Sequence, residues 1–169
     1  MAWDPYVHQI QNTFDPETNS WKVTNVCSYA WIGGHDGTKW ASTEGFELGA
    51  YEAEIMGPDL VSKIKVPCNE PAALLACAGS GGKRNGGQEC GIRIANQKYM
   101  VNRQADEGDI KTVALSKTGG GAFVAVTKQC IIVGSYLKDQ DMSAGGKQSI
   151  GPVTANVLSV AKTLSEAGY

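Results

Sequence analysis

The stretch from residue 91 to residue 136 constrains the fold more than any other part of the sequence. It alternates short segments rich in β-branched and aromatic residues with turns rich in Gly, Asn and Asp. Such segments favour strands, and we place them at residues 91–95, 98–103, 110–115, 122–128 and 130–136. Parallel strands require long crossover connections, so strands joined by such short links form an antiparallel meander.

Further strands are expected before this meander. Residues 23–32 have the composition of a strand, and they end at a turn over residues 33–37 that contains Asp36-Gly37. Residues 38–42 return as the partner strand, which places Trp40 just past the turn. Farther along, Val61, Ile64 and Val66 indicate more strand material, which we interpret as an irregular hairpin.

A short helix is predicted at the N-terminus. Trp3, Tyr6, Val7 and Ile10 recur at helical spacing and form one apolar stripe. Asp4 and Pro5 suit a first helical turn, because an acidic side chain complements the helix dipole there and proline lacks only an N–H that has no partner.

Two more helices complete the pattern. Asn69 is a suitable N-cap and Pro71 an early position for a helix that continues over residues 72–78, and the glycine-rich residues 79–87 then form a loop. Apolar residues at helical spacing predict a C-terminal helix over about residues 152–166. Helices at the two ends of a continuous antiparallel sheet define an α+β fold. We expect one domain over residues 1–169, because the chain shows neither a repeat nor a linker.

The composition narrows the classes of protein to consider. Apolar residues make up 42% of the chain and charged residues 19%, which is an ordinary globular mixture. The net charge of −2 argues against a nucleic-acid-binding protein, which needs a concentrated basic surface. No run approaches the ~18–20 apolar residues that span a bilayer, and no basic start with an apolar run marks a signal peptide, so we expect a cytoplasmic protein.

The cysteines fit the same compartment. There are five, an odd number at wide spacing with no Cys-x-x-Cys, so neither a disulfide framework nor a zinc site is indicated. We interpret them as free thiols in a reducing compartment: Cys27, Cys68, Cys77, Cys90 and Cys130.

Catalytic and cofactor motifs are missing from the sequence. The candidate phosphate loop near Gly82-Lys83 is followed by Arg84 instead of Ser or Thr. Neither His8 nor His35 has a paired carboxylate or nucleophile motif, and nothing marks one cysteine as activated. We therefore predict a protein that is not an enzyme and that needs neither a cofactor nor a metal.

The aromatic residues carry more functional information. Trp3 and Tyr6 share one helix face at the N-terminus, Trp40 follows a hairpin turn, and Tyr169 ends the chain. If the terminal helices pack side by side on one sheet face, these rings meet in an exposed cleft. Aromatic grooves recognise polyproline II helices, because proline rings stack on flat aromatic faces and the ligand is already ordered.

Five motifs in this order resemble the profilin family and cover roughly three-quarters of the chain: Trp3-x-x-Tyr6-Val7, Ile32-Gly-x-x-Asp36-Gly-x-x-Trp40-Ala41, Gln97-Lys98-Tyr99-Met100-Val101, Thr118-Gly-Gly-Gly-Ala and Leu164-x-x-x-Gly168-Tyr169. Many profilins are shorter, and the excess lies at about residues 44–88, as in the long-insert profilins of protists such as apicomplexans. The resemblance implies the α+β profilin fold, in which a central antiparallel meander carries the N- and C-terminal helices together on one face.

The same resemblance implies a function and two sets of residues. Profilins bind monomeric actin, regulate its polymerisation, and bind proline-rich partners such as formins; we expect a monomeric protein. The family's poly-proline cleft corresponds by position to Trp3, Tyr6, Trp40, Thr163 and Tyr169, and Thr163 stands where relatives usually have His or Tyr. The actin face corresponds to Lys98, Val101, Arg103, Asp109, Lys117, Gly151, Thr154 and Leu158.

Some positions depart from the family's pattern on the actin face. Leu115 and Leu158 stand where many relatives have a basic residue and a tyrosine, and Ser159 replaces a common acid. The resemblance also implies that basic residues bind phosphoinositide headgroups; the matching positions are Lys98, Arg103, Lys117, Lys138 and Lys147.

Two other classes of protein fit the sequence. A sheet with flanking helices also suits a small non-enzymatic sensor or scaffold domain, in which Trp3 and Trp40 belong to the core. A thiol enzyme without a recognisable motif is the third class. Both alternatives predict that poly-L-proline leaves the tryptophan fluorescence unchanged.

Overall fold

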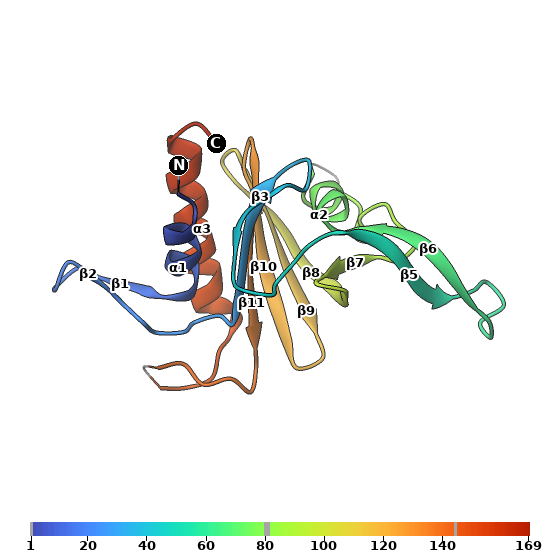
Figure 1. Cartoon of the computed structure of the whole chain (residues 1–169), viewed down its shortest axis with the longest axis horizontal. Coiled ribbons are helices and arrows are strands. Elements are labelled where there is room, and N and C mark those ends of the chain that lie inside the picture. Colours follow the sequence, from blue (N-terminus) through green and yellow to red (C-terminus); the bar gives the residue numbers. More distant parts are fainter. Residues whose placement is uncertain (1, 80–81, 144) are drawn as a thin grey trace.

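A seven-stranded antiparallel sheet forms the centre of the computed structural model, which describes residues 2–79, 82–143 and 145–169 (Figure 1). The strand order is β4-β3-β11-β10-β9-β8-β7. The strands are β3 (Tyr29–Gly34), β4 (Lys39–Ser42), β7 (Ile92–Ile94), β8 (Gln97–Glu107), β9 (Ile110–Lys117), β10 (Gly120–Val126) and β11 (Cys130–Leu137). The predicted meander and the α+β class are confirmed.

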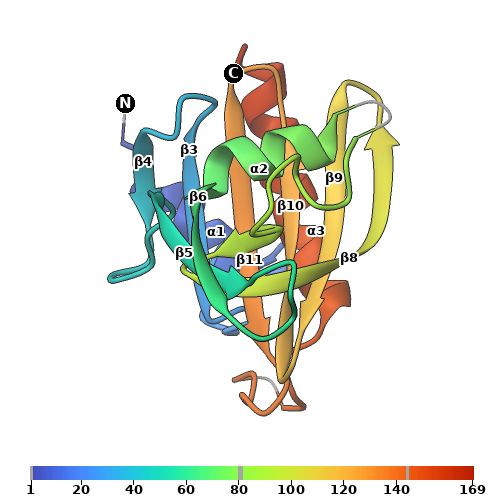
Figure 2. The same ribbon diagram turned by 90° about the vertical axis from the view of Figure 1, so that its right-hand side faces the viewer.

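Helices cover both faces of this sheet. The terminal helices α1 (Asp4–Gln11) and α3 (Ile150–Glu166) lie side by side on one face, as predicted (Figure 1). Figure 2 shows α2 (Glu70–Ala78) lying across the strands on the opposite face. Within the described residues, no helix is both long enough and apolar enough to span a bilayer.

Two apolar cores follow from this layering. Ile10, Ile32, Val157 and Leu164 belong to the core between the sheet and the terminal helices, whereas the fully buried Trp31 belongs to the core beneath α2. Strands β10 and β11 are buried along nearly their whole length, because helices cover both of their faces.

A glycine allows the terminal helices to approach the sheet closely. A Cβ atom at Gly134 in β11 would lie 2.9 Å from Val153 Cγ1, 2.9 Å from Val157 Cγ2 and 3.3 Å from Ile10 Cγ2. Side chains from both helices therefore pack directly on the backbone of Gly134. Asn156 of α3 joins the helices directly, since its Nδ2 donates to the carbonyl oxygens of Ile10 (3.0 Å) and Asn12 (2.9 Å).

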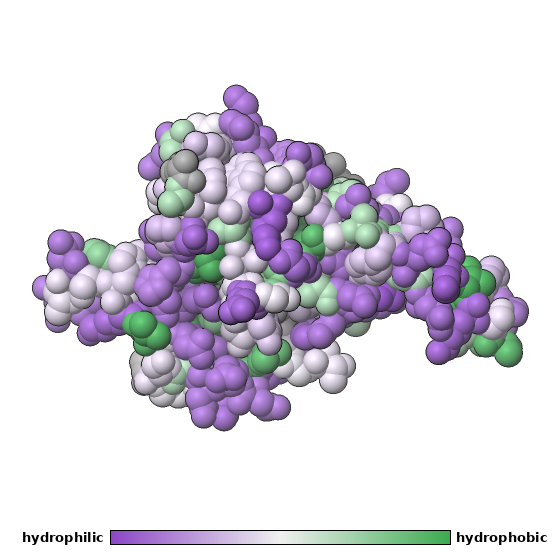
Figure 3. Space-filling view, viewed as in Figure 1, coloured by the Kyte–Doolittle hydropathy of each residue, from purple (hydrophilic) through white to green (hydrophobic). Residues whose placement is uncertain are grey.

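Residues 44–88, the expected insert, contain a hairpin of β5 (Ala50–Met56) and β6 (Lys63–Asn69) followed by α2. The hairpin projects from the body of the molecule (Figure 1), and Figure 3 shows hydrophobic atoms near its outer end. Val61, predicted as strand, instead lies in the connecting turn and is 83% exposed. This part of the earlier prediction is wrong.

A buried carboxylate ties the insert to the main sheet. Glu70, at the start of α2, is 1% exposed and accepts hydrogen bonds from the Tyr51 hydroxyl and from the amides of Ala95 (3.0 Å) and Asn96 (2.8 Å). Ala95 and Asn96 form the β7–β8 turn with φ of 51° and 62°, in the left-handed region. These contacts stabilise the turn, because both of its strained residues donate to one carboxylate.

The predicted start of α2 is correct. Asn69 Oδ1 accepts a hydrogen bond from the Ala72 amide at 3.0 Å, which is the geometry of an N-cap. The helix ends at Ala78, next to the predicted glycine-rich loop, of which residues 80 and 81 lie outside the described residues.

The predicted strand at residues 23–32 begins too early, because β3 starts only at Tyr29. The amides of Thr24 and Asn25 donate to the side chain of Asn12 at 3.0 and 3.3 Å instead of to a neighbouring strand. Asn25 has φ of 54°, and Val23 is 69% exposed. The residues before Tyr29 therefore do not form a strand, although their β-branched composition favours one.

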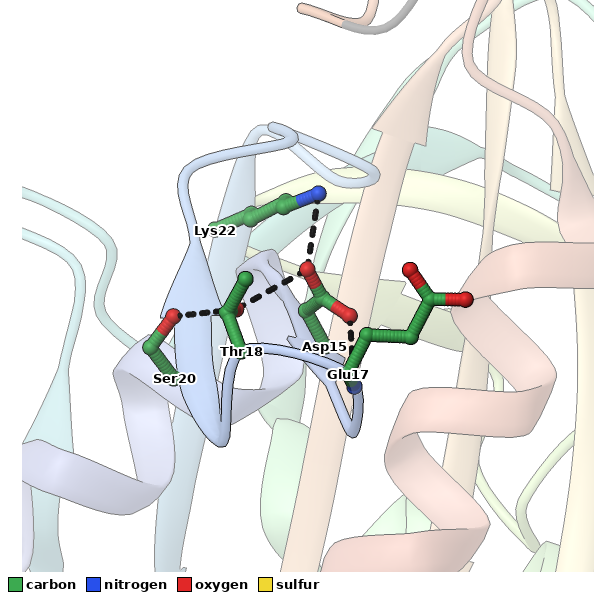
Figure 4. A network of polar contacts seen from close by, with 5 residues as sticks. All are labelled: Asp15, Glu17, Thr18, Ser20 and Lys22. Carbon is green, nitrogen blue, oxygen red and sulfur yellow. Dashed lines mark hydrogen bonds and ion pairs between the residues drawn. The ribbon is translucent and has the colours of Figure 1, made fainter.

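A second hairpin was not predicted, because its strands have three residues each: β1 (Thr13–Asp15) and β2 (Ser20–Lys22). Figure 4 shows the polar network on one of its faces. Asp15 pairs with Lys22 at 2.8 Å and accepts hydrogen bonds from the Thr18 hydroxyl and the Glu17 amide. The hydrogen bond from Lys22 is the main cause that lowers the pKa of Asp15 to about 2.

The close approach at Gly134 gives a stability prediction. Gly134→Ala should lower the free energy of unfolding by roughly 1–3 kcal/mol, because the added methyl group overpacks the contact with Val153 and Val157. The measurement is urea denaturation followed by circular dichroism. Gly49→Ala is the matched control, since a Cβ atom there meets nothing within 4 Å. Equal stability of both variants would contradict the proposed packing constraint.

Candidate protein-binding surfaces

Four aromatic rings from distant parts of the chain meet beside the terminal helices. The ring centroid of Trp3 lies 5.9 Å from Tyr6, 4.5 Å from Trp40 and 5.0 Å from Tyr169. Trp40 and Tyr169 are 6.0 Å apart. All four residues are half-buried. We call them the terminal aromatic cluster: Trp3, Tyr6, Trp40 and Tyr169.

The chain end is folded back to complete this cluster. Gly168 has φ of 97°, which only glycine adopts easily, and its carbonyl accepts a hydrogen bond from Gln129 Nε2 at 2.7 Å. The Tyr169 amide then donates to the carbonyl of Leu164 at 2.9 Å. These contacts hold the last ring against Trp3 and Trp40.

A glycine also lies beneath the Trp40 indole. A Cβ atom at Gly34 would lie 3.5 Å from Trp40 Cζ2 and 3.6 Å from its Nε1, so the indole packs on bare backbone. The turn between the strands is held by Asp36, whose carboxylate accepts hydrogen bonds from the Thr38 amide (2.9 Å) and hydroxyl (3.0 Å). Those bonds lower the pKa of Asp36.

Thr163 differs from the other four predicted poly-proline residues. It is exposed on α3, and its hydroxyl donates to the carbonyl of Ser159 at 3.0 Å. The side chain thus offers a methyl group but no ring. If the chain were a sensor or scaffold with Trp3 and Trp40 in its core, these two side chains would be buried, and they are only half-buried.

A groove lies between α3 and the strands β8, β9 and β10 and has a volume of about 350 Å³. Three residues predicted for the actin face line it: Arg103, Thr154 and Leu158. Phe123 and Ile150 add apolar side chains to its lining, and Glu107 adds a carboxylate. We call this surface the α3 groove. Phe123, Ile150 and Glu107 were not predicted, although Phe123 follows from the alternation of β10 once the face of α3 is known.

The structure separates other predicted actin-face residues from this groove. Val101 is buried in the core beneath α2, and Lys117 Nζ lies 5.5 Å from the ring centroid of Tyr99, which belongs to that same core. Both side chains therefore lie on the sheet face opposite α3. Lys98, Asp109 and Gly151 are exposed and do not line the groove.

A bulge in β8 explains why Val101 and Arg103 point to opposite faces. In a regular strand, residues two apart share a face. Here Val101 pairs with Leu115 and Arg103 with Ala114, so one extra residue of β8 is accommodated between them. The register shift turns Arg103 toward α3, and the local sequence pattern does not predict this shift.

The five basic residues expected to bind phosphoinositides do not form one patch. Arg103 lines the α3 groove, whereas Lys117 lies on the other sheet face. Lys147 already pairs with Asp141 at 2.6 Å, and this hydrogen bond is the main cause that raises the pKa of Lys147. Lys98 and Lys138 are exposed.

The thiols have the properties of buried structural groups. All five cysteines are buried and free. Burial raises the pKa of Cys27 to about 12 and that of Cys68 to about 11, and it also raises the pKa of Cys77 and Cys130. These four thiols are protonated at neutral pH and are therefore poor nucleophiles. Among the described residues, no group of three or more His, Cys, Asp or Glu could hold a metal ion.

Comparison with known proteins gives the family. The family model described as Profilin matches residues 1–169. The profilin of Tetrahymena pyriformis is 35% identical over 171 residues, which cover 99% of this chain and 99% of that protein. The chain belongs to the profilin family. Profilins are actin-binding proteins that catalyse no reaction, and the chain is accordingly an actin-binding regulator and not an enzyme.

Solved structures of profilins share the fold. Profilin IA of Acanthamoeba castellanii superposes with a TM-score of 0.62 at 20% identity, over 99% of this chain and all of that chain. Mouse profilin IIa, in complex with a double repeat from the FH1 domain of mDia1, gives a TM-score of 0.55 at 18% identity over the full length of both chains. At these identities the likeness concerns the arrangement of helices and strands.

The terminal aromatic cluster gives a prediction that needs no ligand. Tyr169→Ala should shift tryptophan emission to longer wavelength, because the ring that contacts Trp3 and Trp40 is removed and water reaches both indoles. The measurement is steady-state fluorescence with excitation at the indole band. Tyr29→Ala is the control, since Tyr29 stacks on Phe46 and not on a tryptophan. An unchanged emission maximum in Tyr169→Ala would contradict the observed contacts.

Proposed function

We propose that the chain binds monomeric actin through the α3 groove and proline-rich segments, such as those of formin-like proteins, through the terminal aromatic cluster. It would act in this way as a monomer in the cytoplasm and couple actin monomers to proline-rich partners. The main support for the proposal is that four half-buried aromatic rings, three from the two ends of the chain and one from β4, lie together.

The chemistry of the terminal aromatic cluster supports a proline-rich ligand. Proline rings stack on flat aromatic faces, and a polyproline II helix loses little entropy on binding because it is already ordered. Trp3 and Trp40 are tilted by 31° to each other with centroids 4.5 Å apart, so they form a continuous aromatic surface. Mouse profilin IIa, which shares this fold, is found in complex with an FH1 repeat.

The α3 groove supports the actin contact. Family membership makes the chain an actin binder, and the groove combines apolar side chains with one arginine, a composition typical of interface cores. Arg103, Thr154 and Leu158 are the predicted residues that meet there. We therefore centre the contact on these three residues and leave Lys117, which faces the other side of the sheet, outside it. Binding of phosphoinositide headgroups stays a prediction from the family.

The poly-proline site is tested by removing one ring. Trp40→Ala should weaken poly-L-proline binding at least tenfold, about 1.4 kcal/mol, because it takes away one of the two indole rings of the cluster. The measurement is tryptophan fluorescence titrated with poly-L-proline, with actin sequestration assayed in parallel and expected to persist. Trp21→Ala is the matched control, because Trp21 is an exposed tryptophan that packs on Phe14 and His8. Equal affinity of Trp40→Ala and the unmodified protein would exclude the cluster as the site.

The actin site is tested by reversing one charge. Arg103→Glu should weaken binding of monomeric actin by tenfold or more, because it reverses the charge of the arginine that lines the α3 groove. Lys117→Glu is the control and should bind actin normally, since its side chain lies on the opposite sheet face. Poly-proline binding should be unchanged in both variants. The proposal fails if Lys117→Glu loses actin binding while Arg103→Glu keeps it.

A further inference from the structure

Two of the five buried cysteines meet where the insert joins the main sheet. Cys68 lies in β6 and Cys90 in the segment just before β7, and their exposed fractions are 2% and 1%. Both belong to one small apolar cluster that also contains Ala53 and Val66. This cluster is separate from the two cores that hold the helices on the sheet.

Contacts with the backbone hold the segment that contains Cys90 beside the segment that contains Cys68. Cys90 Sγ lies 3.8 Å from the carbonyl oxygen of Pro67, the residue before Cys68. On the other side, Gln88 exchanges two hydrogen bonds with the backbone of Asn69, the residue after Cys68, at 2.8 and 2.9 Å. The segment of Cys90 is thus fixed against both chain neighbours of Cys68, and the Cys90 thiol lies close enough to raise the pKa of Cys68.

The remaining thiols have different neighbours. Cys27 Sγ donates to the carbonyl oxygen of Ile10, Cys77 Sγ accepts from Gln104 Nε2, and Cys130 Sγ contacts Thr127 Oγ1. In the part of the chain that the structure describes, Cys68 is the cysteine whose pKa a neighbouring thiol raises, and that neighbour is Cys90.

We propose that Cys68 and Cys90 form an oxidant-sensitive pair that closes to an intramolecular disulfide. A peroxide supplies the oxidising power. It converts one thiol to a sulfenic acid and releases one water, and the second thiol then displaces the hydroxyl group as a second water while the S–S bond forms. The two sulfur atoms lose two electrons and two protons in total, and the peroxide takes up both.

The surroundings of Cys68 determine how readily its thiol is oxidised. Burial, the neighbouring Cys90 thiol and the nearby Glu70 carboxylate raise the pKa of Cys68, and the thiolate is the reactive form. The pair therefore stays reduced until a strong or sustained oxidant is present. Once formed, the bond joins β6 to the segment before β7 and fixes the β5–β6 hairpin to the edge of the main sheet.

The test is peptide mapping of the full-length protein after exposure to hydrogen peroxide. Free thiols are blocked with iodoacetamide in denaturant, and the digest is analysed by mass spectrometry without reduction. We expect a linked peptide pair that contains Cys68 and Cys90, two hydrogens lighter than the sum of the reduced peptides. In the oxidised protein, amide hydrogen exchange in the β5–β6 hairpin should slow at least threefold, because the cross-link opposes local opening.

Two variants make the test specific. Cys90→Ser should abolish the linked pair, and Cys77→Ser, another buried cysteine, should retain it. Circular dichroism and poly-L-proline titration of both variants verify that each is folded. The proposal is overturned if Cys68 and Cys90 are both alkylated after peroxide treatment, if either is oxidised to a sulfinic acid alone, or if Cys90→Ser still yields a linked Cys68 peptide.

Discussion

The packing of both terminal helices on the bare backbone of β11 is the contact on which the rest of the structure depends. Gly134 leaves room for Val153 and Val157 of α3 and for Ile10 of α1 at a single point of the sheet. Asn156 then bonds α3 to the end of α1. Because the two helices are fixed to each other and to the sheet, Trp3 and Tyr169 become neighbours, and their rings join one aromatic surface.

Helix α3 connects the two candidate surfaces. Its 17 residues span about 25 Å, with Ile150, Thr154 and Leu158 facing the α3 groove and the residues after its end carrying Tyr169 into the terminal aromatic cluster. The two surfaces therefore lie toward opposite ends of one rigid helix and share none of their residues. This arrangement suits a protein that holds an actin monomer and a proline-rich segment at the same time.

The sequence predicted those features that depend on local pattern. Strand alternation and turn residues gave the meander, the Asn69 cap gave α2, and helical spacing gave α1 and α3. The family motifs named Trp3, Tyr6, Trp40 and Tyr169, which the structure brings together. Features set by tertiary contacts were not predicted. One is the β8 bulge, which turns Arg103 toward α3 and away from the face of Val101. The other is the Asn12 side chain, which accepts hydrogen bonds from the amides of residues 24 and 25. Neither the bulge nor the Asn12 contact produces a periodic pattern in the sequence, because each depends on a partner that is distant in the sequence.

We expect the two surfaces to bind their partners independently, and isothermal titration calorimetry measures whether they do. Monomeric actin is titrated into the protein alone and into the protein saturated with poly-L-proline. We expect a ternary complex and Kd values for actin that agree within about twofold, since the α3 groove and the terminal aromatic cluster share no residue. An actin affinity that falls in proportion to the poly-L-proline concentration would show that both ligands compete for one surface and would rule out independent binding.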